Sequence, residues 1–272
     1  FMPQHTTPYS LEQIGYGIVR FNSSGIFSTH KDHMVDPYAA TRLPKEAQVE
    51  GIQFSPQAKG PFPSMVLLHD KWGLTSSIQD LAKRLACEGY VIIVPNLYGR
   101  QGGMVTANEE VADALRERLN QQQVLQDINA SFEFLNANLA EDTTLEQLTR
   151  NAHAVIGFGM GGTLAIHTAA KRRRLQAAVA VNPELPQDSA VSSGLYCPLM
   201  LHIPEQTAAL TQDQLQQFQG DCKQAGKNLT VQHYPGTADG FCNALSPVFQ
   251  QTETDSVLQS STEFINAILK KS

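Results

Sequence analysis

Short unbroken apolar segments alternate with amphipathic stretches from about residue 50 onward, and this alternation restricts the fold more than any other feature of the sequence. Residues 65–68 and 91–94 are apolar runs of the kind typical of strands covered on both faces. Residues 76–88, between them, have helical spacing and precede Gly89, a common helix terminator. Because parallel strands need crossovers of this kind, we predict an α/β fold with a mostly parallel, twisted sheet and helices on both faces.

The same alternation continues to the end of the sequence. Within residues 108–139, apolar residues at spacings of three and four indicate a helix face packed in the core: Leu125, Ile128, Phe132, Leu135 and Leu139. The remaining predicted strands are residues 154–158, 177–181, 198–203 and 229–234, and the remaining predicted helices are residues 161–171, 211–225 and 255–271.

The N-terminal part of the chain lacks this pattern. Its glycine-containing segments at residues 15–17 and 22–25 indicate a hairpin or lid lying against the sheet. A chain of 272 residues with 42% hydrophobic residues fits one α/β domain plus an extension better than two domains. We therefore predict an N-terminal extension, residues 1–48, packed on an α/β domain formed by residues 49–272.

The charge balance argues against nucleic-acid binding. The net charge is -6, and the basic run at residues 171–174 follows a predicted helix, where cations complement the helix dipole. No segment has the length of a membrane span, and residues 1–4 lack the basic and apolar regions of a signal peptide. We expect neither nucleic acid nor a membrane as a partner.

The cysteines and histidines give no indication of a metal site. Four cysteines without a CxxC spacing suit a reducing compartment without zinc or structural disulfides, so we expect a cytoplasmic protein. Residues 30–33 contain two histidines and a carboxylate, but one short cluster lacks the further ligands that a structural metal needs. We expect no metal and no cofactor.

Residues 157–162 read GFGMGG and stand between an apolar run and a helical stretch. This order is typical of a nucleophile elbow, whose outer glycines leave no Cβ where the strand and helix backbones meet. The central residue, Gly159, has no side-chain oxygen or sulfur to attack a carbonyl carbon. A dinucleotide-binding loop is the competing interpretation, but the spacing is not G-x-G-x-x-G and the motif does not follow the first strand.

Four further segments make the chain from about residue 49 to the C-terminus resemble the dienelactone hydrolase family of α/β-hydrolases. Residues 67–74 (LLHDKWGL) are similar to the family's loop beside the elbow, and residues 94–101 (VPNLYGRQ) to the run that ends in a carboxylate-binding arginine. Residues 198–202 (PLMLH) resemble the strand before the triad acid, and residues 234–241 (YPGTADGF) the turn with the triad histidine. The resemblance implies an α/β-hydrolase fold and the hydrolysis of small esters or lactones.

The resemblance also implies roles for individual residues. Asp70 and Lys71 hold the positions of an acidic residue and of an oxyanion-hole amide, and Met160 would supply the second amide. Arg100 matches the arginine that holds a substrate carboxylate. Trp72, beside the oxyanion-hole residue, is interpreted either as the floor of a small-molecule pocket or as simple core packing.

All three triad positions carry a residue foreign to the family. Gly159, Thr207 and Asp239 stand where the family has Cys or Ser, then Asp, then His. A shift of the alignment would put Glu205 near the acid position instead of Thr207. Asn243 replaces a second arginine of the family, so the carboxylate clamp is halved.

These departures lead to a main hypothesis and two alternatives. The main hypothesis is a protein that lacks ester and lactone hydrolysis and binds a small anionic ligand, such as a carboxylate, in the vestigial cleft. The first alternative is an active hydrolase that uses a water or Cys242 together with Asp239 or Asp70. The second is a protein-interaction module that uses the N-terminal extension. The sequence leaves the oligomeric state open.

The histidines do not supply the missing base. His69 adjoins Asp70, but a buried histidine with satisfied hydrogen bonds is the simpler interpretation. His153, His202 and His233 fall on predicted strands, where the same interpretation applies.

Overall fold

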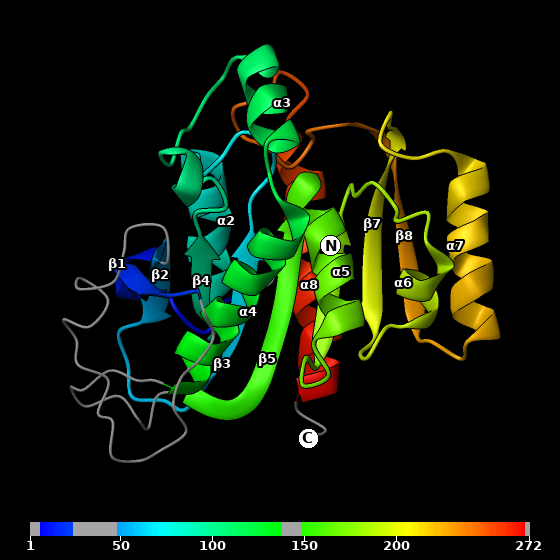
Figure 1. Ribbon diagram of the computed structural model, residues 1–272. Helices are drawn as coiled ribbons and strands as arrows, with labels where there is room; N and C mark the ends of the chain where they lie inside the picture. Colours follow the sequence, from blue (N-terminus) through cyan, green and yellow to red (C-terminus); the bar gives the residue numbers. More distant parts are fainter. Residues whose placement is uncertain (1–5, 24–47, 138–147, 270–272) are drawn as a thin grey trace.

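The computed structural model describes residues 6–23, 48–137 and 148–269 (Figure 1). Within these ranges, eight strands form one sheet in the order β1-β2-β4-β3-β5-β6-β7-β8. β1 pairs antiparallel with β2, and β2 with β4, whereas every other neighbouring pair is parallel. The strands are β1 (Ile14–Asn22), β2 (Gln48–Pro56), β3 (Phe62–Leu68), β4 (Val91–Pro95), β5 (Leu148–Phe158), β6 (Ala177–Val181), β7 (Leu199–Gln206) and β8 (Leu229–Ala238).

Helices follow most of the parallel strands, as the crossovers require. They are α2 (Ser76–Cys87), α3 (Glu109–Glu117), α4 (Gln121–Ala137), α5 (Met160–Lys171), α6 (Ser189–Ser193), α7 (Gln212–Gln224) and α8 (Gln251–Leu269), with short 3-10 turns η1 (Leu11–Gln13) and η3 (Gly99–Gln101). Figure 1 shows α3 apart from the two helix layers, beyond the carboxyl ends of the parallel strands.

The sheet separates two hydrophobic cores. Val66 and Leu68 of β3 face a core built with α4, α5 and α7, whereas Met65 and Leu67 face a core built with α2 and α8. The side chains of successive residues in one strand therefore point to opposite faces of the sheet. Because both faces are buried, the parallel strands are unbroken apolar runs. The predicted α/β class, with a mostly parallel sheet and helices on both faces, is confirmed.

The long segment at residues 108–139 contains two helices. Side-chain oxygens of Asn108 and Asn120 accept backbone N–H groups at the starts of α3 and α4, from Val111 and Gln123. The predicted apolar stripe lies on α4 and is buried at Leu125, Ile128, Phe132 and Leu135, whereas Leu139 lies outside the described residues.

The N-terminal part contributes a strand to the same sheet. β1 pairs with β2 over its whole length, from Ile14 opposite Pro56 to Asn22 opposite Gln48, with Gly15 and Gly17 inside the strand. The remainder of the expected hairpin or lid, residues 24–47, lies outside the described residues. None of the helices in the described ranges combines the length and apolar character needed to cross a membrane.

Candidate functional site

The turn between β5 and α5 has the backbone geometry of an elbow. Gly159 at its apex has φ 53° and ψ -119°, and the positive φ is one that residues with a side chain rarely adopt. A Cβ on Gly157 would lie 2.0 Å from the carbonyl oxygen of Gly161, and a Cβ on Gly161 would lie 2.2 Å from that of Leu68. Both outer glycines are thus required by backbone packing.

The apex itself is open. A Cβ built on Gly159 would lie 3.4 Å from the Cβ of Asp70, so a side chain at this position would have room beside the acid. The Gly159 N–H donates to the carbonyl oxygen of Val181 at 2.9 Å, and this bond holds the turn against the end of β6.

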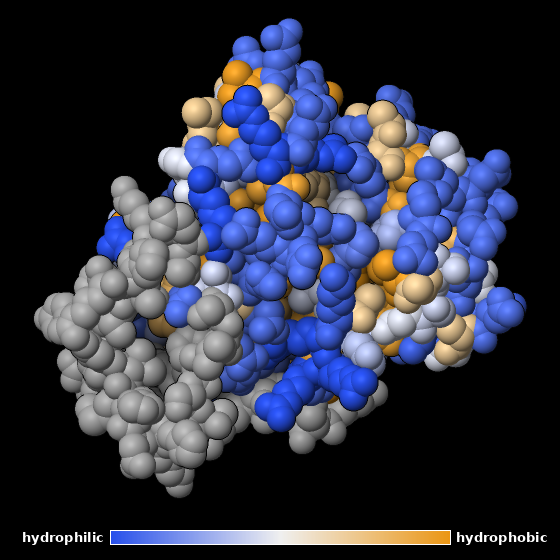
Figure 2. Space-filling model, in the orientation of Figure 1, coloured by the Kyte–Doolittle hydropathy of each residue, from blue (hydrophilic) through white to orange (hydrophobic). Residues whose placement is uncertain are grey.

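A cleft of about 550 Å³ lies over the apex, a volume within the usual range for small-molecule sites. Its lining residues come from the loop after β3, α2, the region of α3, the elbow, the end of β6 and the segments after β7 and β8. Figure 2 shows apolar atoms below α3 between hydrophilic residues. The cleft brings together most of the site residues expected from the sequence: Asp70, Lys71, Trp72, Gly159, Met160, Asp239 and Asn243, together with Cys242.

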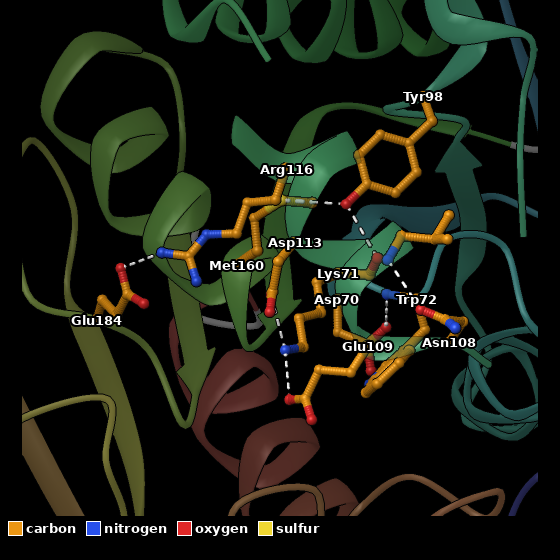
Figure 3. Close-up of polar contacts among 11 residues, drawn as sticks. Asp70, Lys71, Trp72, Tyr98, Asn108, Glu109, Asp113, Arg116, Met160 and Glu184 are labelled. Atoms are coloured by element: carbon orange, nitrogen blue, oxygen red, sulfur yellow. Dashed lines mark hydrogen bonds and ion pairs between the residues drawn. The ribbon is translucent and has the colours of Figure 1, made fainter. Parts of the chain in front are cut away.

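Asp70 is the acidic residue beside the apex. One of its oxygens accepts the Trp72 N–H at 3.0 Å (Figure 3). Burial raises the pKa of Asp70 from 3.8 to about 6, although the Trp72 N–H and the Lys71 charge oppose the shift. Asp70 is thus ionised at neutral pH but far more basic than an ordinary aspartate.

Lys71 turns its ammonium group toward α3. Its Nζ lies 2.9 Å from Glu109 Oε1 and 2.8 Å from Asp113 Oδ1, and 5.1 Å from the centre of the Trp72 ring (Figure 3). The Lys71 backbone carbonyl accepts the Tyr98 hydroxyl at 3.0 Å. The Lys71 side chain therefore holds α3 in place. The backbone N–H of Lys71 has no hydrogen-bond partner among the described residues.

Arg116 and Glu184 are cleft residues that sequence reasoning missed. They form an ion pair that ties α3 to the segment after β6 (Figure 3). Sequence reasoning could have identified Glu184, because it follows the carboxyl end of a predicted parallel strand, where ligand sites commonly occur. Arg116 gave no such signal, since the place of α3 over the sheet depends on tertiary contacts.

Arg100 lies outside the cleft, contrary to its expected role as a ligand-binding residue. Its guanidinium makes a two-point contact with Asp127 of α4, at 3.0 and 2.8 Å, and also donates to Ser23 Oγ at 2.8 Å. It is absent from the residues that line the cleft. The guanidinium is held by the carboxylate of α4 instead, so the expected arginine clamp has no member in the cleft.

The residues at the triad acid and histidine positions are adjacent in the sheet but not joined by their side chains. Gln206 of β7 is in register with Ala238 of β8, so Thr207 and Asp239 are the next residues of paired strands. Thr207 Oγ1 donates to the side-chain oxygen of Asn182 at 3.0 Å, and Thr207 does not line the cleft. Asp239 lines it, and one of its oxygens accepts the Ala208 N–H at 2.9 Å.

The alternative acid, Glu205, is also engaged elsewhere. Its Oε2 accepts the Gly236 N–H at 2.7 Å. Asn243, at the position of the family's second arginine, accepts the Leu245 N–H with its side-chain oxygen at 3.0 Å. Glu205 does not line the cleft, and the amide of Asn243 cannot supply the positive charge of the family's arginine.

His69 is a satisfied core residue. The Leu97 N–H donates to His69 Nε2 at 3.0 Å, so the proton is on Nδ1, which donates to the Asp70 carbonyl at 2.7 Å. Burial lowers its pKa from 6.5 to about 4. His153 and His202 are likewise buried between side-chain partners, and no histidine of the described ranges lines the cleft.

Cys242 is a poor nucleophile in this environment. Its side chain is buried, and burial raises the pKa of its thiol from 9.0 to about 12. The thiolate is the reactive form of cysteine. Cys242 therefore stays protonated at neutral pH.

The described residues contain no group of three His, Cys, Asp or Glu side chains that could hold a metal ion. The histidines at residues 30 and 33 lie outside the described ranges, so the expectation that they bind no metal stays a prediction.

Comparisons with known proteins agree on one family. Residues 49–269 match the Dienelactone hydrolase family. A Methylorubrum extorquens protein named "Putative carboxymethylenebutenolidase" is 25% identical over 208 residues, which are 72% of this chain and 69% of that protein. A protein with the same name from Escherichia coli K12 is 23% identical over 219 residues, or 76% of this chain and 78% of that protein.

A solved structure gives the same result for the fold. The crystal structure of a dienelactone hydrolase-like promiscuous phosphotriesterase from metagenomic libraries has a TM-score of 0.75 and covers 94% of this chain and 99% of its own. The sequence identity is 13%, so this likeness concerns the fold alone. The expected α/β-hydrolase fold is confirmed.

Proposed function

The chain belongs to the dienelactone hydrolase family, and on that basis we propose that it binds a small molecule in the family's cleft but has lost nucleophilic hydrolysis of esters and lactones. The observation that carries the proposal is the composition of the cleft around the elbow. Gly159 has no nucleophilic atom, and no histidine of the described residues lines the cleft. The catalytic unit therefore lacks both its nucleophile and its base.

Part of the binding apparatus does not depend on these side chains. The backbone N–H groups of Met160 and Lys71 have no hydrogen-bond partner among the described residues, and both residues line the cleft. Two such donors would hold a carbonyl oxygen of a ligand in the manner of an oxyanion hole. A family member without its triad would keep a rate enhancement on the order of 10³ from these donors and binding alone.

One observation favours a second candidate, a hydrolase in which water attacks directly. The Asp70 carboxylate, with its pKa raised by burial to about 6, lies beside the empty apex and could accept a proton from a water there. The water oxygen would bond to the carbonyl carbon, the proton would pass to Asp70, and it would then go to the departing alcohol. The buried, protonated thiol of Cys242 gives no comparable support to the thiol alternative.

Ester turnover and covalent labelling test the proposal together. We expect the wild-type protein to hydrolyse an aryl acetate no faster than its Asp70→Asn variant, and a fluorophosphonate probe to label no side chain in the cleft. Turnover that falls at least about tenfold in Asp70→Asn but persists in Cys242→Ser would establish water attack instead. A covalent adduct on any cleft residue would refute the proposal.

We also propose a cytoplasmic location. Cys87, Cys197, Cys222 and Cys242 are all free thiols and all buried, which suits a reducing compartment. Fractionation of the source cells, followed by immunodetection, tests this location. Recovery in a membrane or secreted fraction would contradict it.

A further inference from the structure

The charged residues that line the cleft are mostly acidic. Four carboxylates line it, from Asp70, Glu109, Glu184 and Asp239, against two cations, from Lys71 and Arg116. At neutral pH the lining therefore has two more negative than positive charges. Low-dielectric walls around a cleft strengthen such an imbalance.

Ion pairs already occupy both cations. Lys71 is shared between Glu109 and Asp113, and Arg116 pairs with Glu184. Figure 3 shows both cations directed toward these carboxylates. A ligand anion would have to displace a carboxylate from one of these pairs to gain a positive partner.

Two carboxylates remain outside every ion pair found among the described residues. Asp70 accepts one backbone N–H, from Trp72, and Asp239 accepts one, from Ala208. Each of these contacts uses a single oxygen of the carboxylate. The partial burial of Asp70 and its raised pKa agree with a charge that its surroundings compensate only in part.

The remaining walls suit the organic part of a ligand. Trp72, Phe158 and Phe241 are among the residues that line the cleft, together with Ile78 and Leu81. Aromatic faces attract cations, and the Lys71 ammonium already lies over the Trp72 ring. Carboxylates next to aromatic rings are a combination that binds ammonium groups.

We propose that the cleft selects a small organic cation, an alkyl- or arylammonium compound whose charged group is held by Asp70 and Asp239. This inference rests on the proposed function, since it names the class of ligand for the same cleft. It replaces the anionic ligand expected from the resemblance, because Arg100 lies outside the cleft and Asn243 stands in place of the second arginine. A neutral carbonyl oxygen on the same ligand would accept the free N–H groups of Met160 and Lys71.

Three probes of similar shape and different charge test the proposal: benzylammonium, benzyl alcohol and benzoate. Binding to the full chain is measured by titration calorimetry at pH 7.5 and low ionic strength. We expect benzylammonium to bind at least about tenfold more tightly than benzoate, with benzyl alcohol between them. Added salt should narrow the difference between the charged probes.

Two conservative variants locate the charge. Asp70→Asn and Asp239→Asn each keep an oxygen for the backbone N–H of Trp72 or Ala208, so the local turns are preserved. Each variant should weaken benzylammonium binding about fivefold or more and leave benzyl alcohol within about twofold. Glu263→Gln, at an exposed position on α8 outside the cleft, is the matched control and should bind like the wild type.

The outcomes separate this inference from the proposed function. Equal affinities for the three probes, or tightest binding of benzoate, would overturn the cation preference and leave small-molecule binding in place. An equal loss of benzylammonium binding in the Glu263→Gln control would overturn it as well, since a general surface charge would then explain the result. Failure of all three probes to bind in the millimolar range would contradict both.

Discussion

At the scale of a single residue, the position of Asp70 in the cleft conflicts with the stability of the fold. It faces the empty apex beside Gly159, and burial raises its pKa to about 6. A raised pKa in the folded state means that the ionised carboxylate is less stable there than in the unfolded chain. Asp70, which contributes to the negative charge of the cleft, therefore costs stability at neutral pH.

This cost predicts that Asp70→Asn stabilises the protein. Ionised Asp70 reduces the unfolding free energy above pH 6, and the cost disappears as the pH falls toward the unfolded-state pKa of 3.8. At pH 7 we expect the variant to gain about 1–3 kcal/mol. Urea unfolding at pH 7 and pH 4 measures the gain, which should be nearly absent at pH 4. A variant less stable than the wild type at pH 7 would contradict the assignment.

The empty apex gives a second prediction at this scale. Gly159→Ser should fold, with a strain cost of about 1–2 kcal/mol from the positive φ, because Cβ at this site meets only Asp70 at 3.4 Å. The single variant should remain inactive on aryl esters, since no histidine of the described residues lines the cleft to deprotonate the serine. The triple variant with Thr207→Asp and Asp239→His should gain on the order of 10²-fold, because these two positions directly follow the paired ends of β7 and β8. An active single variant would show that a base is already present.

At the scale of elements, the junction of β5 and α5 depends on the absence of two side chains. The Gly161 Cβ position lies 2.2 Å from a backbone oxygen of β3, which cannot move without shifting the centre of the sheet. Gly220 of α7 offers a contrast, since nothing lies within 4 Å of the position its Cβ would take.

These two glycines form a matched pair. Gly161→Ala should lower the unfolding free energy by about 3 kcal/mol through overpacking against backbone. Gly220→Ala should raise it by about 0.5–1 kcal/mol, because alanine is the better helix former and has free space there. Chemical denaturation of both variants gives the comparison. A loss of less than about 1 kcal/mol for Gly161→Ala would mean that the turn is not tightly packed.

Sequence reasoning succeeded where structure is encoded locally. The unbroken apolar runs predicted the buried strands, and the stripe from Leu125 to Leu135 predicted the buried face of α4, because both depend on periodicity along one segment. The segments that resemble the family indicated Asp70, Lys71, Gly159 and Asp239, and all four residues line one cleft.

Sequence reasoning was less successful where a charged side chain has potential partners on several elements of the fold. Arg100 follows its strand as expected, but its guanidinium pairs with Asp127, whose helix approaches from elsewhere in the sequence. The resemblance also gave no indication of Glu109, Arg116 and Glu184, charged residues that line the cleft and that no motif contains.

At the scale of the whole molecule, stability depends on keeping several histidines neutral. Burial lowers the pKa of His69 and of His153 to about 4, and that of His202 to about 3. Each is held between two partners in the core or at its edge. A depressed histidine pKa means that the unfolded chain binds a proton more readily than the folded one below pH 6.5.

The protein should therefore lose stability in weak acid. Between pH 7 and pH 5 the three histidines lower the unfolding free energy, and the protonation of Asp70 offsets part of the loss. We expect a net decrease on the order of 4 kcal/mol, measured from urea unfolding curves at the two pH values. Unchanged stability at pH 5 would show that these histidines are protonated in the folded state.

The outer glycines of the turn at residues 157–161 are required by backbone contacts and not by any reaction. Substitutions that remove the catalytic side chains therefore do not relax the requirement for these glycines, because folding still depends on them. In a protein that has lost the reaction, such a turn would therefore persist. A genome search that infers an esterase from this glycine pattern would count proteins that have inherited only the architecture.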